Sequence, residues 1–311
     1  MKKLVIGISI LCSFAQASLS DHFKKAENKS HVHSYKNIDF IYMINLDQRP
    51  EKFESCTKQL HPHGIYPYRF SAVNGWELSL ETINDVGLAY HPSMKRNMPE
   101  GLLGTSYLSE DGGPSHEIIS EPGKVYFCHC MGRGPIGIVL SHLSVLKDAY
   151  DSGYETIWVM EDDIEIIRDP KEIPLLINQL DRTVGKANWD ILFTDRNTKN
   201  QNGEYVPTAA YAPRPNYVPI NSKRFGLRRQ LGKHFLEVGA RYGAYSMIVR
   251  RSGMKKILDF FEKYKMFFPY DMEIYACPGM RIFTVKHDVV STQIRALSDN
   301  GGPNYLKKQQ G

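Results

Sequence analysis

The sequence has no strong excess of charge, few cysteines, and no long hydrophobic run after its first residues. Its 311 residues include 39 basic and 34 acidic side chains, which leaves a formal net charge of only +5. So small an excess does not favour a nucleic-acid partner. Beyond the amino terminus no apolar segment approaches twenty residues, so we expect no stable transmembrane span. With 42% hydrophobic residues, the chain is long enough to bury a sizeable core.

Only five cysteines are present, and one of them, Cys12, lies in the amino-terminal apolar run. The remaining four are compatible with buried thiols or with one disulfide, and spacing does not choose between them. Cys128-His129-Cys130 looks like half of a zinc site. No second Cys/His pair at ligand spacing accompanies it, so we expect no structural zinc.

The first residues have the features of a secretory leader. Lys2 and Lys3 precede an apolar run from Leu4 to Ala15, and Ala15-Gln16-Ala17 is a small-x-small cleavage signal. The sequence therefore predicts a signal peptide over residues 1–17 and an exported protein. The alternatives are an uncleaved membrane anchor at the amino terminus or a cytoplasmic protein.

The middle of the chain alternates between strand and helix patterns. This order predicts one α/β domain over residues 38–297, with a mainly parallel central sheet flanked by helices. Residues 18–37 are polar and predict a flexible lead-in, and residues 298–311 predict a frayed polar tail. Two Gly- and Pro-containing stretches without a clear period, 91–134 and 196–236, predict two long loop insertions.

The most informative stretch is Thr156 to Glu165, in which a β-branched and aromatic run ends in Glu161, Asp162 and Asp163. The run predicts a buried strand. Three adjacent carboxylates repel one another and need a positive partner, which a divalent cation carrying phosphates supplies. Ligands of open α/β sheets bind outside the carboxyl ends of the strands. A solvated acidic turn is the alternative interpretation.

Three motifs in a consistent order surround this strand: Ile44 to Lys52, Ala72 to Gly75, and Gly137 to His142 followed by Met160 to Asp163. Together they resemble glycosyltransferase family 25, which includes lipopolysaccharide and procollagen galactosyltransferases. The resemblance covers roughly residues 38–295. Asn74 stands where the family usually has Asp, and Lys52 replaces an Arg, which removes the fork that binds a carboxylate or phosphate through two bonds.

The resemblance implies a GT-A-type fold and a metal-dependent transfer of a hexose, galactose or glucose, from a UDP-sugar. The acceptor would be a hydroxyl on a glycan or a protein, and the anomeric centre would be inverted. The metal would be Mn²⁺ or Mg²⁺. A different class of protein, a secreted sugar- or nucleotide-binding effector with the same fold but no catalysis, is the competing hypothesis.

The same resemblance assigns roles to residues. Asp163 is the first expected metal ligand, Asp162 binds metal or ribose, and His287 completes the site. The expected contacts to the nucleotide sugar are Asn45, Leu46, Asp47, Arg49, Asn74, Ser141, His142 and Asp162. Arg49 equally fits a structural salt bridge, Asn74 a plain turn, and His142 a buried and satisfied imidazole.

Inversion by direct displacement needs one general base for the acceptor hydroxyl. Asp271, which follows Pro269-Tyr270, is the candidate, and Glu273 is held in reserve. The alternative for Asp271 is that it caps the helix that follows.

Overall fold

The structure is a computed structural model that describes residues 18–109, 113–208 and 212–306. The predicted signal peptide, residues 1–17, lies outside the described residues, so export stays a prediction. In the part of the chain that is described, every helix is too short or too polar to traverse a bilayer. The four cysteines in that part, Cys56, Cys128, Cys130 and Cys277, are free thiols.

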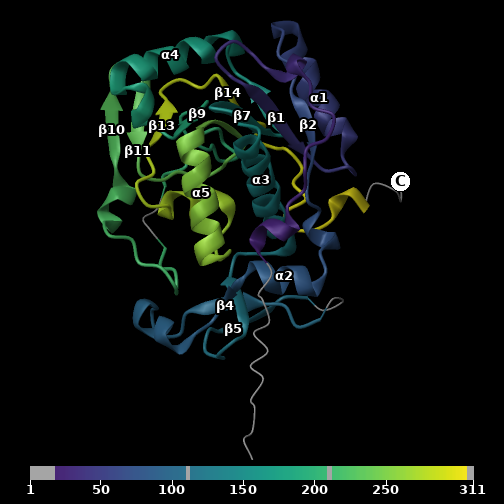
Figure 1. The fold of residues 1–311 in the computed structure, drawn as a ribbon, viewed down its shortest axis with the longest axis vertical. Helices are drawn as coiled ribbons and strands as arrows, with labels where there is room; N and C mark the ends of the chain where they lie inside the picture. The colour runs from purple at the N-terminus through teal and green to yellow at the C-terminus, as the bar shows by residue number, and fades with distance from the viewer. Residues whose placement is uncertain (1–17, 110–112, 209–211, 307–311) are drawn as a thin grey trace, which may run out of the picture.

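A central sheet organises the described residues, with eight strands in the order β10-β11-β13-β9-β12-β7-β1-β2 (Figure 1). Their bounds are β1 Phe40–Asn45, β2 Tyr68–Ser71, β7 Thr156–Glu161, β9 Ile191–Phe193, β10 Arg228–Leu231, β11 Phe235–Val238, β12 Ser246–Arg250 and β13 Ile282–Val285. The predicted α/β class is thus confirmed.

The sheet is mixed, with a parallel part and an antiparallel part. β1 pairs in parallel with β2 and β7, and β13 with β9. β12 runs antiparallel between β7 and β9, and β10, β11 and β13 form an antiparallel edge. Strand direction depends on the path of the connecting loops, which the pattern of side chains does not reveal.

Helices cover both faces of this sheet. They are α1 Pro50–Leu60, α3 Arg133–Asp151, α4 Ile173–Val184 and α5 Arg251–Tyr264. Along β7, Ile157 and Val159 join the core that includes α3 and α5, whereas Trp158 and Met160 join the core under α1 and α4. The alternation follows from the two-residue period of a strand and makes three layers. Figure 1 shows α3 and α5 in front of the sheet.

The stretch predicted as an irregular insertion, residues 91–134, contains most of a second sheet, so that prediction is wrong in part. The sheet has the order β3-β6-β4-β5 and lies with α2 beside the main body (Figure 1). Its elements are α2 Leu80–Val86, β3 Leu88–Ala89, β4 Leu103–Ser106, β5 Ser115–Ile118 and β6 Val125–Cys128. β4 and β5 pair through only four residues each, which is too short to stand out in the sequence.

The remaining elements are short. A two-stranded sheet joins β8 Ile164–Ile166 to β14 Val290–Thr292 immediately after the acidic residues, and α6 spans Tyr270–Glu273. The 3-10 turns are Leu19–His22, His31–His33, His61–His63, Gly75–Glu77, Pro92–Asn97, Pro170–Glu172, Lys186–Asn188, Ser222–Gly226 and Ile274–Ala276.

Both polar ends contact the domain where they are described. Leu19 is buried, and Lys24 Nζ donates a hydrogen bond to Ala72 O at 2.7 Å. At the other end Asp299 is buried and paired with Arg49.

Candidate functional site

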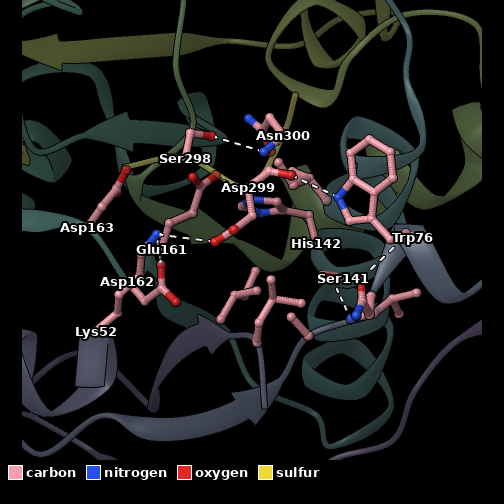
Figure 2. Close-up of a pocket in the computed structure, with 18 residues that line it drawn as sticks. Lys52, Trp76, Ser141, His142, Glu161, Asp162, Asp163, Ser298, Asp299 and Asn300 are labelled. Carbon is pink, nitrogen blue, oxygen red and sulfur yellow. Dashed lines mark hydrogen bonds and ion pairs between the residues drawn. The ribbon is translucent and has the colours of Figure 1, made fainter. Parts of the chain in front are cut away.

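A pocket opens where the carboxyl ends of β1, β2 and β7 meet. Because the three strands are parallel neighbours, their ends lie at one edge of the sheet. The walls come from these strand ends, from α3, and from residues 298–300. Figure 2 shows the acidic residues that follow β7 on one side of the pocket and the indole of Trp76 on the other.

Two glycines bring the second and third sequence motifs together. A Cβ on Gly75 would lie 1.9 Å from Arg133 O, and one on Gly137 would lie 2.5 Å from Gly75 N. The turn after β2 therefore rests directly on the backbone of α3. Ser141 Oγ then accepts a hydrogen bond from Val73 N at 2.8 Å. The motifs are adjacent because only glycine permits this approach.

The three carboxylates at the carboxyl end of β7 have different partners. Glu161 Oε1 lies 2.9 Å from His142 Nε2, and Asp162 Oδ2 accepts a hydrogen bond from Asn45 Nδ2 at 2.6 Å. Asp163 Oδ1 is buried and has no hydrogen-bond partner among the described residues. Buried carboxylate oxygens are rarely left in this state, so this oxygen of Asp163 is the one that lacks a compensating hydrogen bond.

Burial and mutual repulsion act on the two aspartates. Burial raises the pKa of Asp162. Burial, together with Glu161 and Asp162, raises the pKa of Asp163 to about 7. Lys52 Nζ is 3.8 Å from Asp162 Oδ1 and 4.0 Å from Asp299 Oδ2, so its charge is shared between two carboxylates. One shared lysine leaves this side of the pocket short of positive charge.

The donor set fits a hard divalent cation that takes only part of its ligands from the protein. Among the described residues no three His, Cys, Asp or Glu side chains converge into a complete metal site. Mg²⁺ commonly binds through one or two carboxylates and completes its shell with water and substrate phosphates, and oxygen ligands suit Mn²⁺ as well. The orphaned oxygen of Asp163 beside Asp162 meets that requirement.

The residues at the end of β1 and directly after it have two roles: some line the pocket, and others hold neighbouring side chains in place. Leu46 lines the pocket. Asn45 is buried and orients Asp162 while it accepts a hydrogen bond from Arg69 at 2.7 Å. Asp47 is exposed, binds Arg69 and Ser71, and is absent from the pocket walls. Arg49 forms two bonds to Asp299, at 2.8 and 2.9 Å, which realises the salt-bridge alternative for that residue.

Three further predicted residues all line the pocket. Asn74 donates hydrogen bonds to Glu77 and to Tyr305 Oη, and its Oδ1 accepts one from Trp76 N. Ser141 is satisfied by the backbone on both sides. His142 is stacked on Tyr270, with ring centres 4.2 Å apart, and within the described part of the chain its Nδ1 has no hydrogen-bond partner.

The two acids predicted as bases lie in different surroundings. Asp271 lines a neighbouring pocket and accepts a hydrogen bond from Gly243 N at 2.7 Å. Glu273 is fully buried, and its two oxygens are bound by Arg214 and by the backbone N–H groups of Phe267 and Phe268. It has no free oxygen for a substrate proton, so the structure does not support Glu273 as the reserve base.

His287 is not brought to the acidic residues. It is exposed, and its backbone oxygen accepts a hydrogen bond from Arg168 at 2.9 Å. It precedes β14 at the end that pairs with Ile166, whereas Asp163 lies beyond the opposite end of that short strand pair. We therefore leave His287 out of the site. His287 and Asp163 therefore lie at opposite ends of the strand pair formed by β8 and β14.

Sequence reasoning missed the carboxyl-terminal wall of the pocket. Asp299 and Asn300 line it, and Trp76 Nε1 donates a hydrogen bond to Asp299 O at 2.9 Å. No periodic pattern marks this polar segment. The one signal in the sequence was Trp76 itself, a rare residue placed directly after the glycine of the second motif.

The fold and the site define an α/β protein with a ligand pocket at the carboxyl edge of its sheet and an under-compensated carboxylate pair in that pocket. The model of glycosyltransferase family 25, described as an LPS biosynthesis protein, matches residues 38–274. The chain belongs to that family, which confirms the resemblance seen in the motifs.

Curated proteins with matching sequences carry the same family name or that of a procollagen galactosyltransferase. A glycosyltransferase 25 family member of Drosophila melanogaster is 26% identical over 186 residues, which are 60% of this chain and 25% of that protein. Procollagen galactosyltransferase 2 of Homo sapiens is 23% identical over 160 residues, 51% of this chain and 21% of that protein. The chain spans about a quarter of the length of the curated relatives it matches.

Proposed function

We propose that the protein transfers a hexose, galactose or glucose, from a UDP-sugar to a hydroxyl of a glycan or a protein. The observation that carries this proposal is the buried, unpartnered oxygen of Asp163 beside Asp162 in the pocket at the sheet edge. A diphosphate held through Mn²⁺ or Mg²⁺ is the kind of ligand that relieves such a site. Family membership supports the reaction class, and the relatives named as procollagen galactosyltransferases favour galactose.

The donor pocket, as we name the pocket lined by Asp162 and Asp163, would hold the diphosphate near Lys52. When bound, the divalent ion supplies positive charge against the charge that develops on the leaving diphosphate. Lys52 adds a cation on the same side. Asn45 keeps Asp162 in place through its 2.6 Å hydrogen bond. A GT-A-type arrangement of donor and metal at this edge is part of the proposal.

Asp271 is the proposed general base. As the acceptor oxygen forms its bond to the anomeric carbon from the face opposite the diphosphate, Asp271 takes the hydroxyl proton, the bond to the diphosphate breaks, and the configuration inverts. Burial raises the pKa of Asp271, the Gly243 N–H lowers it, Glu161 raises it and Arg241 lowers it, with a net increase. A carboxylate with a raised pKa is the stronger base.

Donor-dependent release of UDP tests the proposal. Wild-type protein with Mn²⁺ should release UDP from UDP-galactose or UDP-glucose, and Asp163→Asn should lower the rate by at least about a hundredfold, since it weakens charge stabilisation in the transition state. Mn²⁺ binding, followed by electron paramagnetic resonance, should weaken in the same variant. Asp259→Asn removes an exposed carboxylate on α5 and is the matched control.

The competing hypothesis, a secreted binding module without catalysis, has a distinct outcome. Such a protein would bind UDP or a sugar but release no UDP from either donor at any Mn²⁺ concentration. That result, obtained with folded wild-type protein, would reject the transferase.

A further inference from the structure

A second pocket adjoins the donor pocket and has about 250 Å³ of space, enough for a single sugar ring. We name it the adjoining pocket. Ile138, Glu161 and Asn300 line both pockets, so the two pockets are adjacent at these residues. Glu161 and Asn300 are both drawn in Figure 2. In a transfer reaction the donor and the acceptor meet at such a junction.

Strand direction explains how the adjoining pocket forms. β12 is antiparallel to β7, so its amino end lies at the same edge of the sheet as the carboxyl end of β7. Gly243, Ala244 and Tyr245, which lead into β12, therefore face the region of Glu161 and line the pocket. Pro269 to Asp271 supply the opposite wall.

The charges of the two pockets differ. Among the described residues that line the adjoining pocket, the charged side chains are Glu161 and Asp271, and no Lys, Arg or His is present. The nearby Arg241 is fully buried, and its guanidinium is paired with Asp195 behind the pocket. The donor pocket, in contrast, includes Lys52.

We propose that the adjoining pocket is the acceptor subsite, and that it takes a hydroxyl-bearing group without negative charge and rejects phosphorylated or carboxylated sugars. The inference rests on the proposed transferase function and deepens it. The aromatic rings of Tyr245 and Tyr270 and the carboxylates of Glu161 and Asp271 suit a neutral sugar or alcohol, which offers apolar faces and hydroxyl donors. An anion there would meet two like charges with no cation to offset them.

The test compares acceptors matched in shape but not in charge. The first pair of probes is methyl galactoside and the methyl glycoside of galacturonic acid, whose carboxylate is unesterified and ionised. The second pair is methyl glucoside and its 6-phosphate. Each probe is tested with UDP-galactose and Mn²⁺. The wild-type kcat/KM should be roughly a hundredfold lower for the anionic member of each pair. Ligand-observed NMR in the presence of Mg²⁺ and UDP should show the same preference in binding alone.

A variant can reverse the preference without touching the proposed catalytic groups. Pro135 lies in the first turn of α3 and lines the adjoining pocket but not the donor pocket. Pro135→Lys adds a cation there and should raise the anionic-to-neutral ratio by about tenfold. Pro135→Gln, which is uncharged, should leave the ratio unchanged. Because the readout is a ratio, partial loss of folded protein does not affect it.

Each result separates the subsite from the reaction. UDP release without acceptor reports on the donor pocket only, so its absence rejects the proposed function. If UDP release is intact but the anionic probes bind and react as well as the neutral ones, the acceptor subsite is rejected. The subsite is also rejected if no neutral probe binds, or if Pro135→Lys leaves the ratio at the wild-type value.

Discussion

Replacing Asp299 by Asn should release the carboxyl-terminal wall of the donor pocket. Arg49 binds both oxygens of Asp299, and the two side chains are only 3% and 7% exposed. The asparagine keeps one acceptor of similar shape but loses the charge. Loss of a charge-assisted hydrogen bond in such a place weakens docking of the segment by about 2 kcal/mol, or roughly thirtyfold in the open population.

The expected change is local, because residues 298–306 end the described chain and few elements rest on them. Other contacts that hold the segment are the hydrogen bonds from Trp76 Nε1 to Asp299 O and from Asn74 Nδ2 to Tyr305 Oη, both 2.9 Å long. The melting temperature should therefore change little, while the segment exchanges its amide hydrogens faster.

Tryptophan fluorescence gives a direct readout of this opening. Of the three tryptophans, Trp158 and Trp189 are fully buried, whereas Trp76 is half-buried and touches the segment. In Asp299→Asn the emission should shift to longer wavelength as the Trp76 indole gains water, and the KM for the UDP-sugar should rise. Asp259→Asn is again the control. Emission and hydrogen exchange identical to those of wild type would refute the reasoning.

Two further predictions follow from other parts of the site. Gly137→Ala places a Cβ 2.5 Å from Gly75 N, so the motifs must separate and stability should fall by roughly 2–3 kcal/mol, measured by urea unfolding. Gly226→Ala, where a Cβ has open space, should change it little, and equal losses in both variants would contradict the packing argument. Because the base must be deprotonated, and burial raises the pKa of Asp271, transfer should be lost as the pH falls through a value above the ordinary carboxyl range. Asp271→Asn should remove transfer and retain Mn²⁺ binding, and an unchanged pH profile in that variant would exclude Asp271 as the base.

Local patterns predicted the core elements well. The run predicted as a buried strand before the acidic residues is β7. This prediction succeeded because the hydrophobic pattern of neighbouring residues indicates a buried strand or an amphipathic helix. Leu46, Asn74, Ser141, His142, Asp162 and Asp163 all line the donor pocket, and their contacts to a nucleotide sugar or a metal stay a prediction.

Predictions failed where a residue's surroundings come from distant parts of the chain. Glu273 is close to Asp271 in sequence, yet Arg214 and the backbone of Phe267 and Phe268 enclose it. His287 precedes β14 at the end that pairs with Ile166, whereas Asp163 lies beyond the other end of that strand pair. Neither outcome is visible from spacing, because spacing does not say which side of an element is covered.

The sequence by itself determined the α/β class, the acidic strand end, and the family through its ordered motifs, because these depend on residue type and short-range spacing. Only the tertiary structure decided that β12 runs against β7 and so opens the adjoining pocket. It alone placed Asp299 on Arg49, 250 residues apart in the chain. Such pairings arise from the packing of the whole domain, which the spacing of residues along the sequence does not reveal.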